Sequence, residues 1–280
     1  MTRAMSDPPV LDVHHHCGSV MDALGGPHAL GELTAEEWEQ LEWDTRARVM
    51  ANNDVGQAVV IPSHAYLRPD GIADTRRVND HIAAYRERDP EHFPAALGIV
   101  EPLYGARGLE EIDRLADEGR WKGVSIHTRF QGVTTDSPWV VRHVGRMAER
   151  GLVPFVHAYA ETTQESLWQI DKLAADHPDV TMIVLDPFSG HEQTRQCFDV
   201  AERRPNLLFE TALSYTFKFI EDFAVALGAH RVVYGSDLYS YPLQIERSHL
   251  LEQIRASTVL SDSDKAAILG GTARKVLALD

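Results

Sequence analysis

The sequence predicts an α/β fold of the (β/α)8 TIM barrel type, and three observations carry that prediction. Short apolar runs typical of buried parallel strands alternate with amphipathic segments along the whole chain. Eight runs of each kind can be counted, as a closed barrel requires. The 280 residues fit one barrel, and no linker or low-complexity segment divides them. We therefore expect a single domain over residues 1–280, with a flexible tail at residues 1–9 and an additional C-terminal helix.

The strand predictions rest on nearly continuous runs of Val, Ile and Leu, as expected for strands covered on both faces. A doubly wound open sheet is the alternative fold, but the Gly-rich phosphate loop usual after its first strand is missing. The predicted strands are Val10–His16, Gln57–Ser63, Phe93–Val100, Gly123–Thr128, Val153–Ala158, Thr181–Asp186, Leu207–Ala212 and Val232–Asp237.

The helix predictions rest on periodicity and on capping residues. Thr34 and Glu37 form a capping box, and Pro138 follows the N-cap residue Ser137. The predicted helices are 34–53, Ile72–Asp89, Gly108–Glu118, 137–151, Glu161–His177, His191–Arg204, Ser214–Leu227 and Pro242–Ser257, with one more from near Ser261. The Gly-rich segment Ser19–Leu33 follows the first strand, where barrels carry active-site loops, so it favours a lid.

The amino-acid composition limits the classes of partner that the protein is expected to bind. The net charge of −15 argues against nucleic acid or an anionic membrane surface, and no segment is apolar enough to span a membrane. Cys17 and Cys197 are the only cysteines, so no disulfide framework is expected and a cytoplasmic location is the default. A small-molecule substrate is the expected partner.

The stretch Val10–Gly18 carries the strongest chemical signal. It reads as a buried strand that runs into a turn, and side chains alternate faces along a strand. Asp12, His14 and His16 should therefore share one face, with His15 on the other. Two imidazoles at adjacent positions of one face can bind one metal ion, and imidazole suits zinc, iron, nickel and copper.

Polar residues recur at the ends of the other predicted strands. In a (β/α)8 barrel the C-terminal ends of the strands carry the chemistry, so these side chains should meet at one pole. Alone, each of them is more often a satisfied structural residue than a ligand, and their joint position is the signal. They are His64, His127, Arg129, His157, Asp186, Glu210 and Asp237.

Beyond these positions, the sequence resembles the amidohydrolase superfamily, in particular the amidohydrolase-2 branch related to aminocarboxymuconate-semialdehyde decarboxylase. The resemblance covers nearly the whole chain and includes a D-x-H-x-H motif and a Gly-Ser-Asp motif. Thr272 stands where the branch usually has Asn. The motifs are Asp12–His16, Trp121–Val124, Pro154–Ala158, Val233–Asp237 and Ile268–Leu277.

The resemblance implies one divalent metal ion, usually zinc, held by His14, His16, His157 and Asp237. Since zinc lowers the pKa of bound water toward ~7, Asp237 can accept a proton from that water. A homodimer is implied by analogy with relatives. Asp12 either supports the ligands or belongs to the barrel core.

One departure from the branch concerns the sixth strand, where Pro187 replaces the usual histidine. Proline can neither transfer a proton nor donate a hydrogen bond. Asp186, His191 or His127 could take over that role, and Asp186 is the first choice because it ends the strand. The alternative for Asp186 is a structural turn residue that accepts backbone N–H groups.

The remaining site predictions concern substrate binding. Arg129 could bind a substrate carboxylate through two parallel hydrogen bonds, while His64 and Tyr159 follow strands and could line the pocket.

The function expected from the sequence is hydrolysis of a C–O or C–N bond in a small substrate, which can carry a carboxylate, by metal-activated water. The alternative within the branch is a non-oxidative decarboxylase or another lyase. The alternative of a different class is a non-catalytic barrel that binds a ligand or a protein partner.

Overall fold

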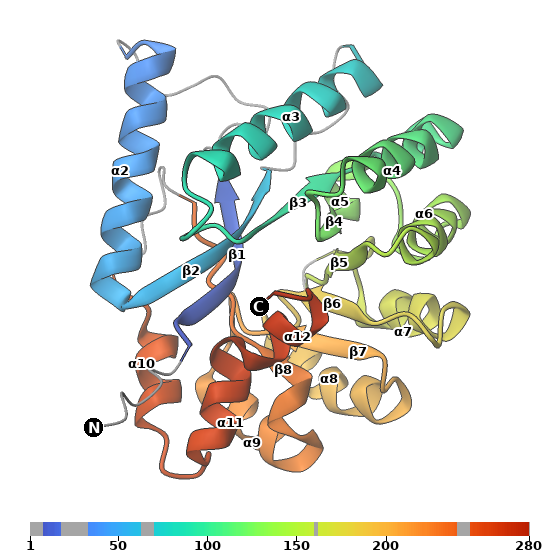
Figure 1. Ribbon diagram of the computed structural model, residues 1–280. Coiled ribbons are helices and arrows are strands. Elements are labelled where there is room, and N and C mark those ends of the chain that lie inside the picture. The colour runs from blue at the N-terminus through green and yellow to red at the C-terminus, as the bar shows by residue number, and fades with distance from the viewer. Residues whose placement is uncertain (1–7, 18–32, 63–69, 160–161, 240–246, 280) are drawn as a thin grey trace.

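The structure is a computed structural model that describes residues 8–17, 33–62, 70–159, 162–239 and 247–279. Eight parallel strands form one sheet in which each strand pairs with the next along the chain. Helices surround this sheet (Figure 1). The predicted (β/α)8 barrel is thus confirmed. The strands are β1 (Val10–Cys17), β2 (Val55–Pro62), β3 (Ala95–Ile99), β4 (Gly123–Ile126), β5 (Val153–His157), β6 (Met182–Leu185), β7 (Leu207–Glu210) and β8 (Val232–Val233).

The barrel closes between β8 and β1 through an irregular segment. The prediction of a strand over Val232–Asp237 is wrong, because β8 ends at Val233. Beyond it, the backbone N–H of Val13 donates to the carbonyl of Tyr234 at 3.0 Å, and that of His16 donates to Leu238 at 2.9 Å. The end of the eighth strand therefore lies against β1 without a regular ladder.

The helices match the predicted order, with shifted ends. The helix expected from Glu161 begins at Leu167, after a capping box of Ser166 and Gln169, and a short helix that the sequence did not predict follows β4. The helices are α2 (Ala35–Asn53), α3 (Ile72–Arg88), α4 (Ala106–Glu118), α5 (Thr128–Gln131), α6 (Pro138–Glu149), α7 (Leu167–Asp176), α8 (His191–Arg203), α9 (Phe217–Leu227), α10 (His249–Ala256), α11 (Asp262–Ala266) and α12 (Thr272–Val276).

Shorter helical turns and some predicted segments complete the chain. Two 3-10 turns cover Pro102–Tyr104 and Ala229–Arg231, and a π-helical turn covers Ala267–Gly271. The predicted lid Ser19–Leu33 lies outside the described residues except for Leu33. Among the described residues, no helix combines the length and the apolarity that crossing a membrane requires.

Strand β1 contains a bulge that changes which side chains face the barrel interior. Its register with β2 shifts between Asp12 and His15, which pair with Ala58 and Val60. Leu11 and Val13 pack in the inner core, whereas Ala58 and Val60 belong to the outer core beneath the helices. Asp12 therefore points outward, where it contacts His15. The expectation that Asp12 shares a face with His14 and His16 is wrong, because the bulge breaks the two-residue alternation.

Candidate metal centre

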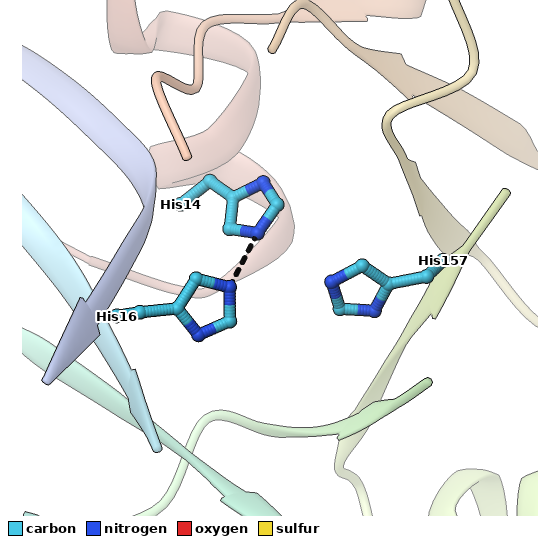
Figure 2. Close-up of side chains that lie close together, drawn as sticks. All are labelled: His14, His16 and His157. Carbon is cyan, nitrogen blue, oxygen red and sulfur yellow. Dashed lines mark hydrogen bonds between the residues drawn. The ribbon is translucent and has the colours of Figure 1, made fainter. Parts of the chain in front are cut away.

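Three histidines converge at the C-terminal pole of the barrel (Figure 2). His14 and His16 extend from β1, and His157 faces them from β5; each offers a ring nitrogen, and these atoms lie within 4.8 Å of one another. The Nε2 atoms of His14 and His16 lie 2.9 Å apart. Asp237 Oδ1 lies 3.3 Å from each of these two nitrogens. The structure thus brings together the four predicted metal ligands.

Each of the three imidazoles is oriented by a hydrogen bond from its other ring nitrogen. His16 Nδ1 donates to the carbonyl of Pro62 at 3.1 Å, and His157 Nδ1 donates to that of Ile126 at 3.0 Å. His14 Nδ1 lies 3.3 Å from Glu210 Oε2. Such contacts fix the tautomer, so the Nε2 atoms are the ones that face the shared space.

The donor atoms of His14, His16 and Asp237 lie at separations close to those of a divalent cation site, with the 2.9 Å between the two Nε2 atoms the shortest. With metal–ligand bonds of about 2.0–2.1 Å, a tetrahedral site places its ligand atoms roughly 3.3–3.4 Å apart. The 3.3 Å separations between Asp237 Oδ1 and the Nε2 atoms of His14 and His16 agree with this spacing. Acceptor atoms at such distances repel one another unless a proton or a cation lies between them. Three imidazoles and a carboxylate suit zinc and related transition metals.

The electrostatics also favour positive charge at this place. Burial lowers the pKa of His14, but Asp237 and Glu210 outweigh burial and raise that pKa to about 10. Burial lowers the pKa of His16 to about 4. Burial raises the pKa of Asp237, but His14, His16 and His127 together outweigh this and hold it below the usual range. The cluster thus accommodates one positive charge, which a bound cation would supply.

Asp186 lies at the edge of this cluster, at the tip of β6. It is buried, and its Oδ1 is 3.9 Å from His14 Nδ1 and has no hydrogen-bond partner among the described residues. Burial raises the pKa of Asp186 well above the usual range, and the charge of Asp237 adds to this effect. The turn after β6 is held by the Asp186 carbonyl, which accepts from the backbone N–H of Ser189.

Asp186 and Asp237, which follow β6 and β8 in the chain, have unusual backbone angles. Asp186 has φ of 58° and Asp237 has φ of 55°, in the left-handed region that residues other than glycine seldom adopt. Strained backbone of this kind is concentrated at functional sites. Asp186 directly follows the end of β6 at Leu185, whereas Asp237 lies in the irregular segment beyond the end of β8 at Val233.

Glu210 has a role that the sequence did not reveal, although it stands among the polar strand-end residues. Its Oε2 accepts from the backbone N–H of Asp186 at 3.1 Å, and its Oε1 accepts from that of Ala212 at 2.5 Å. It therefore holds β6, β7 and the His14 ring together. A Cβ atom on Gly235 would lie 2.2 Å from Glu210 Oε1, so only glycine fits there. The signal in the sequence is a carboxylate ending the apolar run Leu207–Glu210.

His127 forms a wall of the site beside His157. The two rings stack with centroids 3.9 Å apart and planes at 4°. His127 Nδ1 donates to Glu165 Oε1 at 2.5 Å, and the backbone N–H of Arg129 donates to the same oxygen at 3.0 Å. No sequence signal marks Glu165, which precedes α7 and approaches His127 only through folding.

Arg129 and Tyr159 lie together. The Arg129 guanidinium stands 4.2 Å from the centroid of the Tyr159 ring and 4.4 Å from that of Phe130. Tyr239 stacks on His16 with a centroid separation of 4.3 Å. In the part of the chain that the structure describes, the site is thus bordered by aromatic rings and by the Arg129 guanidinium.

One predicted residue does not join this group, and another cannot be placed. His191 is the first residue of α8, is exposed, and packs against the rings of Tyr215 and Phe219. His64 lies outside the described residues.

Comparison with known proteins adds a family and a set of structural neighbours. The family model described as amidohydrolase matches residues 12–279. No curated protein matches the chain. A 2,6-dihydroxybenzoate decarboxylase crystallised with 2,6-dihydroxybenzoate has a TM-score of 0.74 at 15% identity, over 97% of this chain and 99% of that chain.

Two further solved structures are similar. 5-Carboxyvanillate decarboxylase from Sphingomonas paucimobilis has a TM-score of 0.74 at 17% identity, over 97% of this chain and 99% of that chain. Dihydroxybenzoic acid decarboxylase from Polaromonas sp. JS666, with bound manganese and the inhibitor 2-nitroresorcinol, has a TM-score of 0.70 at 14% identity, over 97% of each chain. At these identities the likeness shows a shared fold.

Proposed function

The chain belongs to the amidohydrolase family, and from this premise we propose that it is a metal-dependent decarboxylase of a small, planar carboxylate. The observation that carries the proposal is the cluster of four ligand atoms with the unpartnered carboxyl oxygen of Asp186 at its edge. The named decarboxylases among the structural neighbours support this alternative over hydrolysis of a C–O or C–N bond.

His14, His16, His157 and Asp237 would hold the metal ion. We propose zinc, because imidazole nitrogen and carboxylate oxygen are its usual ligands outside thiolate sites. When bound, such an ion would supply positive charge to the oxygens of a substrate carboxylate or phenolate. Manganese is the second ion to test, because one of the similar decarboxylase structures contains bound manganese.

Loss of CO2 breaks a C–C bond and leaves the electron pair on carbon, which must then take a proton. The reaction is redox-neutral and needs one positioned acid. Asp186 is the proposed donor, because it is buried beside the cluster and its carboxyl oxygen has no hydrogen-bond partner among the described residues. Asp237 is the group proposed to exchange that proton, since its side chain is 17% exposed and so reaches the open side.

We propose that Arg129 and the aromatic rings that border the site orient the substrate. Arg129 would bind a substrate carboxylate or phenolate, and the rings of Tyr159 and Tyr239 would lie against a planar ring. His127, held by Glu165 and stacked on His157, is proposed to hydrogen-bond the substrate. The arrangement differs from the one expected for decarboxylases of the branch, because Pro187 stands at the position of their usual sixth-strand histidine.

The test is a paired assay on metal-free protein reloaded with zinc or manganese. It offers 2,6-dihydroxybenzoate and 5-carboxyvanillate for CO2 release, and esters and amides of the same acids for hydrolysis. Metal-dependent CO2 release is expected, and it should vanish in the His14→Ala/His16→Ala variant. Hydrolysis of the esters or amides without CO2 release would contradict the decarboxylase and restore the hydrolase. If the protein binds metal stoichiometrically but shows neither CO2 release nor hydrolysis, the result would favour a non-catalytic binding barrel.

A homodimer and a cytoplasmic location stay predictions. Light scattering of the purified protein would check the first, and fractionation of the native cell would check the second.

A further inference from the structure

We propose that Arg46, His15 and Asp12 form a positioning frame that sets the geometry of the metal centre from outside the barrel. The inference rests on the metal site of the proposed function, and it assigns roles to residues that touch neither the ion nor a substrate. Arg46 comes from α2, and the other two come from the outward face of β1. All three are buried.

The frame is a continuous chain of side-chain hydrogen bonds. Arg46 Nη1 lies 3.0 Å from His15 Nδ1, and His15 Nε2 lies 2.7 Å from Asp12 Oδ2. Arginine has donors but no acceptor. His15 Nδ1 must therefore accept from Arg46, and His15 Nε2–H must donate to Asp12. The direction of the chain is thus fixed from α2 to β1.

Both ends of the frame contact backbone next to the proposed ligands. Arg46 Nη2 donates to the carbonyl oxygen of His16 at 2.5 Å. Asp12 Oδ1 accepts from the backbone N–H of His14 at 3.0 Å and from that of Ser236 at 3.0 Å. Ser236 directly precedes Asp237. The frame therefore holds a backbone group of His14, a backbone group of His16 and the residue before Asp237, which are three of the four proposed ligand positions.

The backbone at these points lacks regular pairing, which is why side chains must fix it. β1 carries the bulge between Asp12 and His15, and Asp237 lies in the left-handed region. The segment after β8 is linked to β1 by an isolated bridge of His15 with Leu238 and by the hydrogen bond from Val13 to Tyr234, and not by a regular ladder. Without the frame, the spacing of His14, His16 and Asp237 would depend on a few irregular backbone bonds.

Arg46 is itself firmly anchored. Its Nη2 donates to Glu42 Oε1 at 2.5 Å, and its Nε donates to Tyr85 Oη on α3 at 2.9 Å. A fully buried guanidinium with these partners cannot move without leaving charges unpaired, which is costly. The helices α2 and α3 thereby fix the end of β1.

The test compares Arg46→Lys with a matched control, Arg231→Lys. Arg231 is also buried, and it donates to the backbone carbonyls of Leu207 at 2.9 Å and Arg204 at 2.8 Å. These contacts lie at the start of β7, at the pole of the barrel opposite the proposed metal ligands. Lysine keeps the charge but loses the planar set of donors in both variants. The readouts are thermal unfolding, zinc affinity by chelator competition, and the visible absorption spectrum of the cobalt-substituted protein, which reports ligand geometry.

For Arg46→Lys we expect a folded protein with zinc affinity about 10- to 100-fold lower, as for other residues that orient metal ligands, and an altered cobalt spectrum. Arg231→Lys should keep wild-type affinity and spectrum at a comparable loss of thermal stability. His15→Phe breaks the same chain while keeping a planar aromatic ring, so it supplies the affinity measurement if Arg46→Lys does not fold.

Three outcomes would overturn the frame. Unchanged affinity and spectrum in Arg46→Lys, or in His15→Phe where the first variant does not fold, would show that the ligands hold their geometry without it. An equal loss in Arg231→Lys would reduce the effect to general destabilisation. A wild-type protein that binds no zinc would instead refute the metal site itself, and the frame with it.

Discussion

Gly235→Ala is the most direct test of how Glu210 supports the metal centre. The new Cβ would lie 2.2 Å from Glu210 Oε1, 2.6 Å from Cδ and 2.7 Å from Cγ. The carboxylate end of Glu210 is buried and held by hydrogen bonds, so it cannot turn aside without breaking them, and Glu210 must leave its place. Its departure would free the backbone N–H groups of Asp186 and Ala212 and the Nδ1 of His14.

The expected cost follows from these contacts. Overpacking a core costs about 1–3 kcal/mol, and each buried donor left unpaired costs about 1–3 kcal/mol more. A loss of ~3 kcal/mol or more in unfolding free energy is expected. With an unfolding entropy of about 2.1 cal/mol/K per residue, this lowers the Tm of a chain of this size by roughly 5 °C. Zinc affinity should fall about 10- to 100-fold, because His14 loses its orienting carboxylate.

A double-mutant cycle identifies the clash as the cause. Glu210→Ala alone removes the same contacts, and in Gly235→Ala/Glu210→Ala the added methyl group has room. The two losses should therefore be far from additive, with the double variant close to Glu210→Ala in unfolding free energy. Measurement by calorimetry and chelator competition on all four proteins decides it. Additive losses, or a Gly235→Ala protein with wild-type Tm and affinity, would refute the reasoning.

Four further outcomes are expected. His14→Ala/His16→Ala should fold but lose most bound metal, checked by metal analysis; stoichiometric metal in this variant would contradict the ligand assignment. Asp237→Asn should lower turnover by ~10²-fold or more, and near-wild-type turnover would remove it from proton transfer. Asp186→Asn should have the Tm of the wild type but lose turnover as strongly as Asp237→Asn, whereas unchanged turnover would limit Asp186 to a structural role. Burial lowers the pKa of His143, whose Nε2 has no hydrogen-bond partner among the described residues, so the unfolded state binds more protons just below pH 6.5 and the unfolding free energy should fall as the pH decreases from there. Denaturant titrations at several pH values should show a weaker pH dependence of the unfolding free energy for His143→Leu than for the wild type. An identical pH dependence would show that His143 does not cause it.

The fold could be predicted because its signals are local. Apolar runs and capping residues such as Thr34 and Ser137 identify strands and helix starts, and both caps are present in the structure. The eighth strand was predicted too long, since the sequence Val232–Asp237 reads as one strand but the chain leaves the sheet after Val233. Residues in functional segments often depart from local rules.

The candidate site was predictable where residues sit at strand ends, and not where partners come from distant segments. His14, His16, His157 and Asp237 are brought together because parallel strands end at one pole. Their supports lie elsewhere, as in the contact of Arg46 with His15, which joins α2 to β1. Nothing in a helix sequence marks one arginine as facing inward, so such contacts emerge only from tertiary packing.

The bulge in β1 makes the order of three consecutive histidines matter more than their number. Because the register shifts between Asp12 and His15, deleting one residue there would restore strict alternation. His14 would then be lost or exchanged for a neighbour, and an outward residue would turn toward the barrel axis. Anyone transplanting this centre onto a designed barrel must therefore copy the extra residue along with the ligands. A transplant that keeps only the His-x-His spacing on an ideal strand would lose the outward link from Asp12 to α2.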